Sequence, residues 1–165
     1  ILNALPPWRG GGEMIKEVSF EKSTYNDLPF KFEAGTPDIE GAIALAAAID
    51  YMNALGMENI AAHEKSLQER ATAALLEIDS IQLYGTAVNK AAVVSFLIKG
   101  VHHYDLGTLM DQMGIAVRTG HHCCQPLMAR FGITGPVRAS FAAYNTEEEV
   151  DLFIAAVKKS TMMLS

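Results

Sequence analysis

The sequence is poor in cysteine: it has two, Cys123 and Cys124, and they are adjacent. Neighbouring thiols cannot form the disulfide framework that staples small secreted domains, so the pattern indicates a reducing, cytoplasmic compartment. Cationic residues are also sparse and scattered, with 13 Lys and Arg against 19 Asp and Glu and a net charge of −6. A general nucleic-acid-binding protein needs clustered positive charge against phosphates. We therefore expect no nucleic-acid partner.

Long hydrophobic runs are missing too. The most apolar stretch, residues 39–56, is interrupted by Glu40, Asp50 and Asn53, and it falls short of the roughly 18 or more consecutive apolar residues that indicate a membrane span. It is interpreted as a buried helix, and no membrane partner is expected. Half of the 165 residues are hydrophobic, which is enough for the core of one domain, or of one domain and a fragment of another.

The pattern of apolar and turn residues predicts an α+β fold. Residues 1–34 lack helical periodicity and are predicted as loop with one or two short strands. Thr36 and Pro37 are predicted as the N-cap and first position of a helix. Thr146 and Glu149 form a capping box at the start of the last helix. The other predicted elements are helices at 57–78 and 103–114 and strands at 81–85, 91–98, 115–118 and 137–142. Helices on a short mixed or antiparallel sheet are expected.

One loop concentrates the reactive side chains. Arg118, His121, His122, Cys123 and Cys124 lie within seven residues. A metal site fits poorly, because four consecutive side chains cannot all turn toward one ion. The cysteines could be small buried hydrophobes. Alternatively one of them is a reactive thiol, with imidazoles to take its proton and a guanidinium to favour the thiolate. Spacing alone does not decide which cysteine faces the chemistry.

A second signal is Arg138, which lies in the strand-like apolar run "PVRASFAAYN". A guanidinium in such a run is costly unless it is paired. Its partner is either an acidic residue of the fold or the carboxylate of a substrate, which the arginine fork can bind in bidentate fashion. A thiol loop followed by such an arginine points to a nucleophile that acts on an amino or keto acid.

Several segments together resemble a known family. "RTGHHC" with "QPLM", followed by "VRASFAAYNTEEEVD", resembles the C-terminal part of the group II (SufS-type) cysteine desulfurases and selenocysteine lyases of the class V aminotransferases. "PPWRGGGEMI", "FEAGTPDIEG" and "HHYDLG" are similar to segments of that family in the same order. The resemblance implies a fold-type I pyridoxal 5'-phosphate (PLP) enzyme. Residues 36–165 would form its small C-terminal domain, and 1–35 a remnant of the large PLP domain.

The resemblance also implies roles for individual residues. Cys123 matches the persulfide-forming cysteine, Arg138 the arginine that binds the substrate carboxylate, and Arg118 lines the same pocket. Thr36 matches a threonine that reaches the PLP phosphate of the other subunit of a homodimer; a phosphate also suits the free N–H groups of a helix N-terminus. Cys124 departs from the pattern, because a small residue without a thiol is common there, so both thiols could react.

The implied reaction releases alanine from L-cysteine, or from selenocysteine in a relative, and leaves a persulfide on Cys123. In the family the sulfur then passes to an acceptor protein for iron–sulfur cluster assembly. None of the eight lysines matches the lysine that holds PLP as a Schiff base, which is expected before Ile1. The fragment alone is therefore expected to be inactive. The alternatives are a non-catalytic interaction module of the same ancestry and a metal-binding domain that uses the His and Cys clusters.

Overall fold

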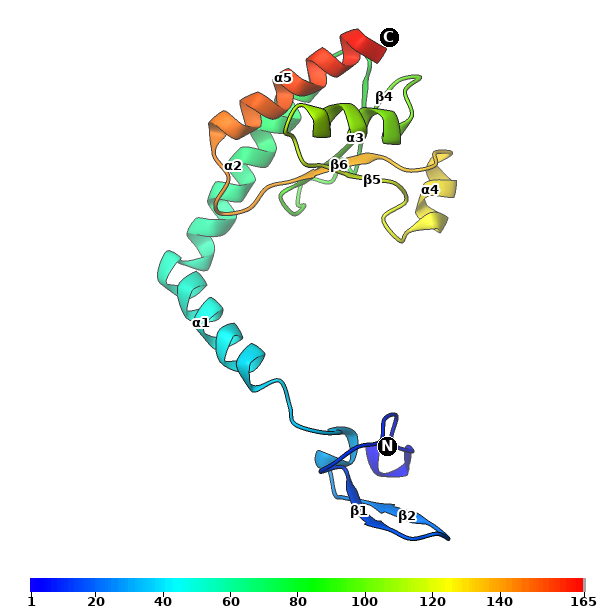
Figure 1. Ribbon diagram of the computed structural model, residues 1–165. Coiled ribbons are helices and arrows are strands. Elements are labelled where there is room, and N and C mark those ends of the chain that lie inside the picture. Colours follow the sequence, from blue (N-terminus) through cyan, green and yellow to red (C-terminus); the bar gives the residue numbers. More distant parts are fainter. Residues whose placement is uncertain (165) are drawn as a thin grey trace. The chain divides into compact units, whose positions relative to one another are not determined.

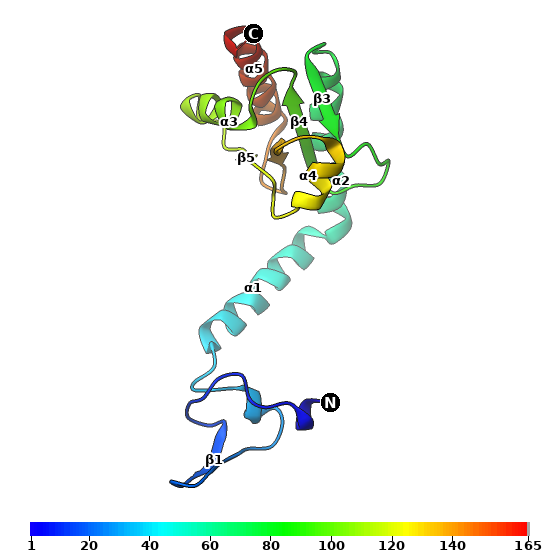
Figure 2. The same ribbon diagram turned by 90° about the vertical axis from the view of Figure 1, so that its right-hand side faces the viewer.

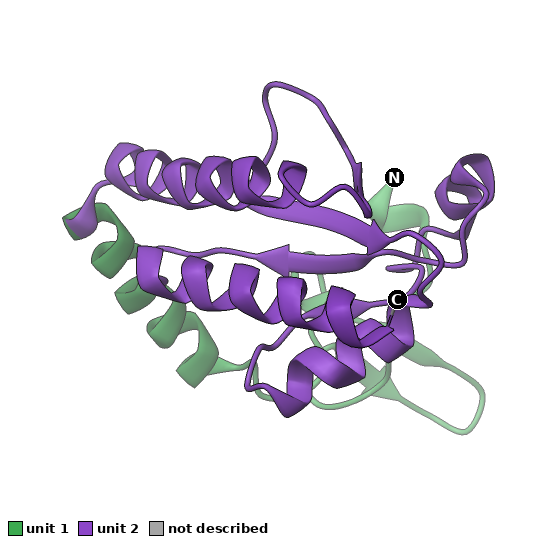
Figure 3. Cartoon of the chain, turned by 90° about the horizontal axis from the view of Figure 1, so that it is seen from above, with its two compact units in different colours: residues 1–54 green, residues 55–165 purple. Residues whose placement is uncertain are grey.

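The computed structural model describes residues 1–164 and divides into two compact units, residues 1–54 and 55–165 (Figure 3). The first unit contains two single-turn 3-10 helices, η1 (Leu2–Ala4) and η2 (Phe30–Phe32), and an antiparallel hairpin of β1 (Ile15–Val18) and β2 (Ser23–Tyr25). The prediction of loop with one or two short strands is therefore confirmed.

Helix α1 (Ile39–Leu55) corrects two predictions. It begins after Asp38, whose carboxylate accepts a hydrogen bond from Gly41 N at 2.8 Å. Thr36 is therefore not its N-cap, because the nearer Asp38 provides a short acceptor and a negative charge at the helix N-terminus. The prediction of a buried helix is also wrong, since none of the residues of α1, all of them described, is buried. The apolar side chains are spread around the helix, and the other described elements of the first unit are a short hairpin and two single-turn 3-10 helices.

The second unit is an α+β domain, as predicted. Its four-stranded sheet has the order β3-β4-β6-β5 and every neighbouring pair is antiparallel. The elements in chain order are α2 (Met57–Leu76), β3 (Ile81–Tyr84), β4 (Val93–Ile98), α3 (His103–Gln112), β5 (Arg118–Thr119), α4 (Gln125–Phe131), β6 (Val137–Ser140) and α5 (Glu147–Leu164). Among the described residues, no helix combines the length and apolar character needed to cross a bilayer.

The core lies on one face of this sheet. Val94, Phe96 and Ile98 alternate with half-buried residues along β4, and all three are almost fully buried. Helices α2, α3 and α5 cover that face (Figure 1). Phe96 meets Phe153 of α5 edge to face, with ring centroids 5.8 Å apart. Burial of apolar side chains of this size stabilises the unit by roughly 1.5–3 kcal/mol each.

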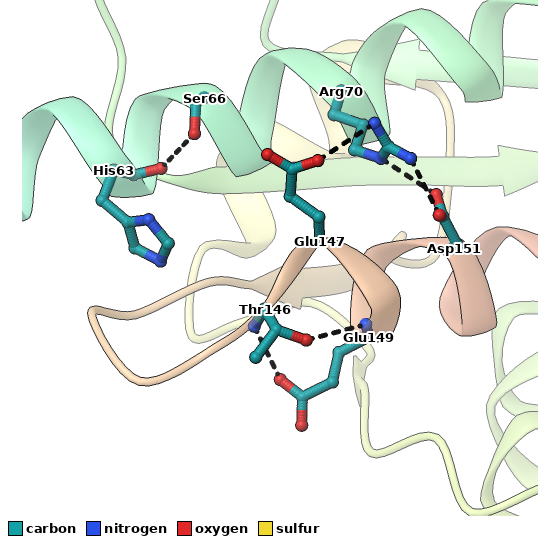
Figure 4. Close-up of polar contacts among 7 residues, drawn as sticks. All are labelled: His63, Ser66, Arg70, Thr146, Glu147, Glu149 and Asp151. Atoms are coloured by element: carbon teal, nitrogen blue, oxygen red, sulfur yellow. Dashed lines mark hydrogen bonds and ion pairs between the residues drawn. The ribbon is translucent and has the colours of Figure 1, made fainter.

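Polar contacts fix α5 against α2 at the edge of the core (Figure 4). Arg70 of α2 donates two hydrogen bonds to the carboxylate of Asp151, at 2.8 and 2.9 Å, and its guanidinium lies 3.4 Å from Glu147. Thr146 N donates to the Glu149 carboxylate at 3.0 Å, and Glu149 N donates to the Thr146 hydroxyl at 3.3 Å. The predicted capping box is therefore confirmed.

Candidate functional site

The two cysteines lie at a tight turn, immediately before α4. Cys124 N donates to His121 O at 2.8 Å, which closes a four-residue turn over residues 121–124. His122 and Cys123, the central residues of this turn, have φ angles of +51° and +58°. A positive φ at a residue other than glycine costs about 1–3 kcal/mol, so surrounding contacts must hold the turn. Both thiols are free and exposed, which removes the alternative that they are buried hydrophobes.

The two imidazoles beside the thiols have different environments. His121 is exposed and its Nδ1 accepts the backbone N–H of Cys123 at 3.0 Å, so neutral His121 carries its proton on Nε2. His122 is half-buried and its Nε2 lies 3.2 Å from Pro136 O, a group that can only accept, so Nε2 is the donor. Burial lowers the pKa of His122, and the positive charges of Arg138 and Arg118 add to this. His122 is therefore neutral at neutral pH.

The strand register brings together the two predicted arginines. Arg118 of β5 lies directly opposite Arg138 of β6. Like charges placed opposite each other in a sheet repel, yet neither arginine has an ion-pair partner among the described residues. The Nε of Arg138 is buried and makes no hydrogen bond within the part of the chain described. Within residues 1–164, Arg138 therefore lacks the acidic partner from the fold that was one of the two alternatives.

A cavity of about 330 Å³ lies between α4 and the uncovered face of the sheet. Arg138, His122 and Cys124 contribute to its wall, and most of its other lining residues are apolar: Tyr84, Val93, Leu127, Met128, Phe131 and Pro136. Cys123 is not among the lining residues; it is exposed one residue earlier on the turn. The turn thus directs its two thiols to different surroundings.

Helix α4, which the sequence analysis did not predict, forms one wall of this cavity and lies at one end of the sheet (Figures 1 and 2). Pro126 lies in its first turn, and Gly132 ends it with a φ of +68°. Proline at the start and glycine just past the end are ordinary helix signals. Those two residues were therefore the signal that could have identified α4.

Thr36, the residue predicted to contact a cofactor phosphate, belongs to the other unit. Its side chain is exposed and its hydroxyl makes no hydrogen bond among the described residues. It is thus available to a phosphate, and the capping role that competed with this interpretation belongs to Asp38. Attachment of PLP requires a lysine, and such lysines are typically desolvated, but none of the lysines in the described chain is buried. The exposed Thr36 hydroxyl is thus compatible with a contact to a phosphate, and no described lysine has the desolvated environment of a Schiff-base lysine.

The histidine and cysteine clusters do not assemble a metal centre in the described part of the chain, which holds no group of three or more His, Cys, Asp or Glu side chains arranged for an ion. His102 instead caps α3, with its Nδ1 accepting from Tyr104 N at 3.3 Å. The His102 ring lies against that of His103, tilted by 34° at a centroid distance of 4.2 Å, and burial lowers the pKa of His103. The second histidine pair therefore has a structural role at the start of α3.

Comparison with known proteins identifies the family of this chain. Residues 1–153 match the aminotransferase class-V family. A probable cysteine desulfurase of Vibrio cholerae is 52% identical over 164 residues, which are 99% of this chain and 40% of that protein. The crystal structure of the cysteine desulfurase CsdA from Escherichia coli superposes with a TM-score of 0.86 at 39% identity, over 97% of this chain and 40% of that one.

A more distant structure shows the same fold. C-DES with glycine covalently linked to its PLP cofactor is 19% identical and superposes with a TM-score of 0.70, over 94% of this chain and 38% of that chain. The chain spans about 40% of the length of the Vibrio cholerae relative and of CsdA. It belongs to the class-V aminotransferase family, in which it matches the C-terminal portion of the cysteine desulfurases and is close to the SufS type.

Proposed function

We propose that this chain works as the C-terminal part of a longer, PLP-dependent cysteine desulfurase, in which Cys123 takes sulfur from L-cysteine and alanine is released. The observation that carries the proposal is the pair of opposed arginines, Arg118 and Arg138. They lie on the strands before and after the exposed thiol turn, and neither has an acidic partner in the part of the chain that the structure describes. An amino acid supplies both of the groups that this arrangement lacks, a carboxylate for the arginines and a sulfur for the thiol.

The carboxylate of the substrate would satisfy Arg138. A buried N–H without a partner costs about 1–3 kcal/mol, and the Nε of Arg138 is such a group. A planar guanidinium binds a carboxylate through two parallel hydrogen bonds, which fixes the orientation of the substrate as well as its position. Arg118 would add a second positive charge from the neighbouring strand, so that repulsion between the two arginines becomes attraction to a shared anion.

Cys123 would act as the sulfur acceptor. Its thiolate attacks the substrate sulfur, a sulfur–sulfur bond forms, and the bond between that sulfur and the substrate Cβ breaks. The electron pair of the broken bond stays on carbon, which is protonated to give the methyl group of alanine. PLP, when bound, supplies the electron sink for chemistry at the amino acid. Thr36 would donate to its phosphate, and its lysine would come from another part of the protein.

The remaining assignments follow from the family. We assign residues 1–35 to the large PLP domain and its connection, and residues 36–165 to the small domain. The exposed apolar surface of α1 supports a covering layer from the rest of a homodimeric enzyme. The persulfide sulfur would pass to an acceptor protein for iron–sulfur cluster assembly in the cytoplasm. Selenocysteine, which has the same carboxylate and amine, is the alternative substrate.

The test compares Cys123→Ala with Cys124→Ala in the PLP-loaded parent enzyme. After a single turnover with cysteine, protein-bound persulfide is located by mass spectrometry. Cys123→Ala should abolish it while the PLP absorbance is retained, and Cys124→Ala should keep it. Undiminished sulfur transfer by Cys123→Ala, or persulfide confined to Cys124, would refute the role of Cys123.

The arginine assignment has its own test. Arg138→Ala should weaken cysteine binding by about 2–5 kcal/mol, the range for loss of one partner of a buried charged pair. Arg130→Ala is the matched control, because this arginine is exposed in the last turn of α4. Unchanged substrate binding by Arg138→Ala would place the carboxylate site elsewhere.

A further inference from the structure

The turn that carries the thiols is joined to α4 by backbone hydrogen bonds from Leu127 N and Met128 N to Cys124 O, and to the segment before β6 by the side chain of His122. Two of its hydrogen bonds are internal: Cys124 N to His121 O, and Cys123 N to His121 Nδ1. The side-chain hydrogen bond that reaches another part of the described chain is from His122 Nε2 to Pro136 O. This contact offsets part of the cost of two consecutive positive φ angles at residues other than glycine.

The anchor point is rigid. Pro136 O also accepts the backbone N–H of Gly120 at 3.3 Å. The backbone of Gly120 is packed so closely on Gly135 that a Cβ at Gly135 would lie 2.3 Å from the carbonyl carbon of Gly120. Pro136 directly precedes β6, which is paired on both sides. The segment to which His122 is tied therefore has little freedom to move.

The same strand carries the carboxylate anchor. Arg138 is two residues beyond Pro136, so the His122 hydrogen bond, together with the backbone bond from Gly120 N, connects the thiol turn to the strand that bears the guanidinium. We propose that His122 is a positioning residue that sets the place of Cys123 relative to Arg138. The inference rests on the proposed function above and adds to it a residue that controls the distance between nucleophile and bound substrate.

An acid–base role for His122 fits the structure less well. Its Nε2 proton is engaged by the Pro136 carbonyl, and its Nδ1 is buried without a hydrogen-bond partner in the described chain. Burial and the two nearby guanidinium groups keep the ring neutral. A neutral side chain that donates from the position of Nε2 should therefore be sufficient. Glutamine has such a donor at the end of a chain of similar reach.

The experiment uses the PLP-loaded parent enzyme with His122→Ala and His122→Gln. His122→Ala should slow single-turnover persulfide formation by about 100-fold, the scale expected when a reacting group is displaced by about 1 Å. Cysteine binding should be unchanged, because Arg138 stays in place. His122→Gln should recover most of the rate. The matched control is His63→Ala, because His63 of α2 makes the same kind of bond, from its Nε2 to Asn145 O at 2.9 Å. This control variant should leave the rate of persulfide formation unchanged.

A second readout does not depend on turnover. Amide hydrogen exchange over residues 121–124 should become about tenfold faster in His122→Ala, as expected from loss of one hydrogen bond, and should return toward the parent value in His122→Gln. Parent-like rates and exchange in His122→Ala, or a His122→Gln variant as slow as His122→Ala, would overturn the inference. Cys123→Ala run in parallel separates the failures: if that variant stays active, the proposed function itself is wrong.

Discussion

Gly135 approaches the backbone of Gly120 so closely that adding a single methyl group at Gly135 should disturb both stability and activity. Gly135→Ala would place a Cβ 2.3 Å from the carbonyl carbon of Gly120 and 2.4 Å from its oxygen. Ordinary van der Waals contact begins at 3.4 Å. Both partners are backbone, so no side chain can rotate away. The two segments must therefore move apart by about 1 Å, and Gly120 directly precedes the turn that carries Cys123.

The magnitude follows from two contributions. Forcing an extra methyl group into a packed site costs about 1–3 kcal/mol. The backbone conformation, with φ at +157°, adds strain for any residue with a Cβ. Gly100→Ala is a control for a positive φ without a packing clash, because Gly100 has a φ of +83° and nothing within 4 Å of its ideal Cβ. That control should cost about 1–2 kcal/mol, the penalty for a left-handed conformation. Gly135→Ala should exceed it by the packing contribution.

Two measurements check this reasoning. Urea unfolding of this chain should show Gly135→Ala less stable than Gly100→Ala by about 1–3 kcal/mol. In the PLP-loaded parent enzyme, persulfide formation should fall by about 100-fold in Gly135→Ala, since the displacement lies at the base of the thiol turn. Two results together would contradict this reasoning: equal stability of Gly135→Ala and Gly100→Ala, and an unchanged rate of persulfide formation in Gly135→Ala. The segments of Gly120 and Gly135 would then separate easily, and the segment at Pro136 would not be rigid.

Three further predictions concern the described core, a helix terminus and pH. Phe96→Ala should lower the free energy of unfolding by about 3–5 kcal/mol. Leu152→Ala, at an exposed site, should change it by less than about 0.5 kcal/mol. Equal losses of stability in the two variants would contradict the assignment of the core. Thr146→Ala removes the N-cap hydroxyl of α5 and should lower the free energy of unfolding, measured in urea, by about 1 kcal/mol. An unchanged free energy of unfolding would show that the capping box is dispensable. Burial lowers the pKa of His122 and His103, so the unfolded chain binds more protons as the pH falls below the ordinary histidine pKa of about 6.5. Stability should therefore decrease from about pH 7 to 5.5, and a double Gln variant should flatten this slope; an unaltered slope would refute the cause.

The core helices α2 and α5 were predictable because the residues that they bury recur in the sequence with helical periodicity. Residues of α2 and α5 recur at three- and four-residue intervals, and the predicted stripe Val150, Phe153, Ile154 and Val157 is buried throughout. The strand predicted at 115–118 shows the limit of such patterns. Only Arg118 and Thr119 join the ladder, because an apolar run fixes which residues face the core and not which backbone groups find a partner strand.

The site was predictable in its residue types and not in its connections. The sequence pointed to a thiol loop and to Arg138, and both lie in the second unit. The position of Arg118 opposite Arg138 depends on strand register. The hydrogen bond from His122 to Pro136 depends on a turn in which two residues other than glycine have positive φ angles, a conformation that the sequence does not indicate. Such long-range pairings are set by tertiary structure, which local propensity does not encode.

Three features of this chain would each be costly in a self-sufficient domain, and they have a common explanation. An alanine-rich helix, α1, has no buried residue, although a helix that is apolar on all sides is normally covered by protein. Arg118 and Arg138 lie opposite each other, and neither has an ion-pair partner among residues 1–164. Cys123 is held in a left-handed conformation on an exposed turn. Under the proposed function, a covering protein surface would relieve the first feature, the substrate carboxylate would relieve the second, and the substrate sulfur would make use of the third.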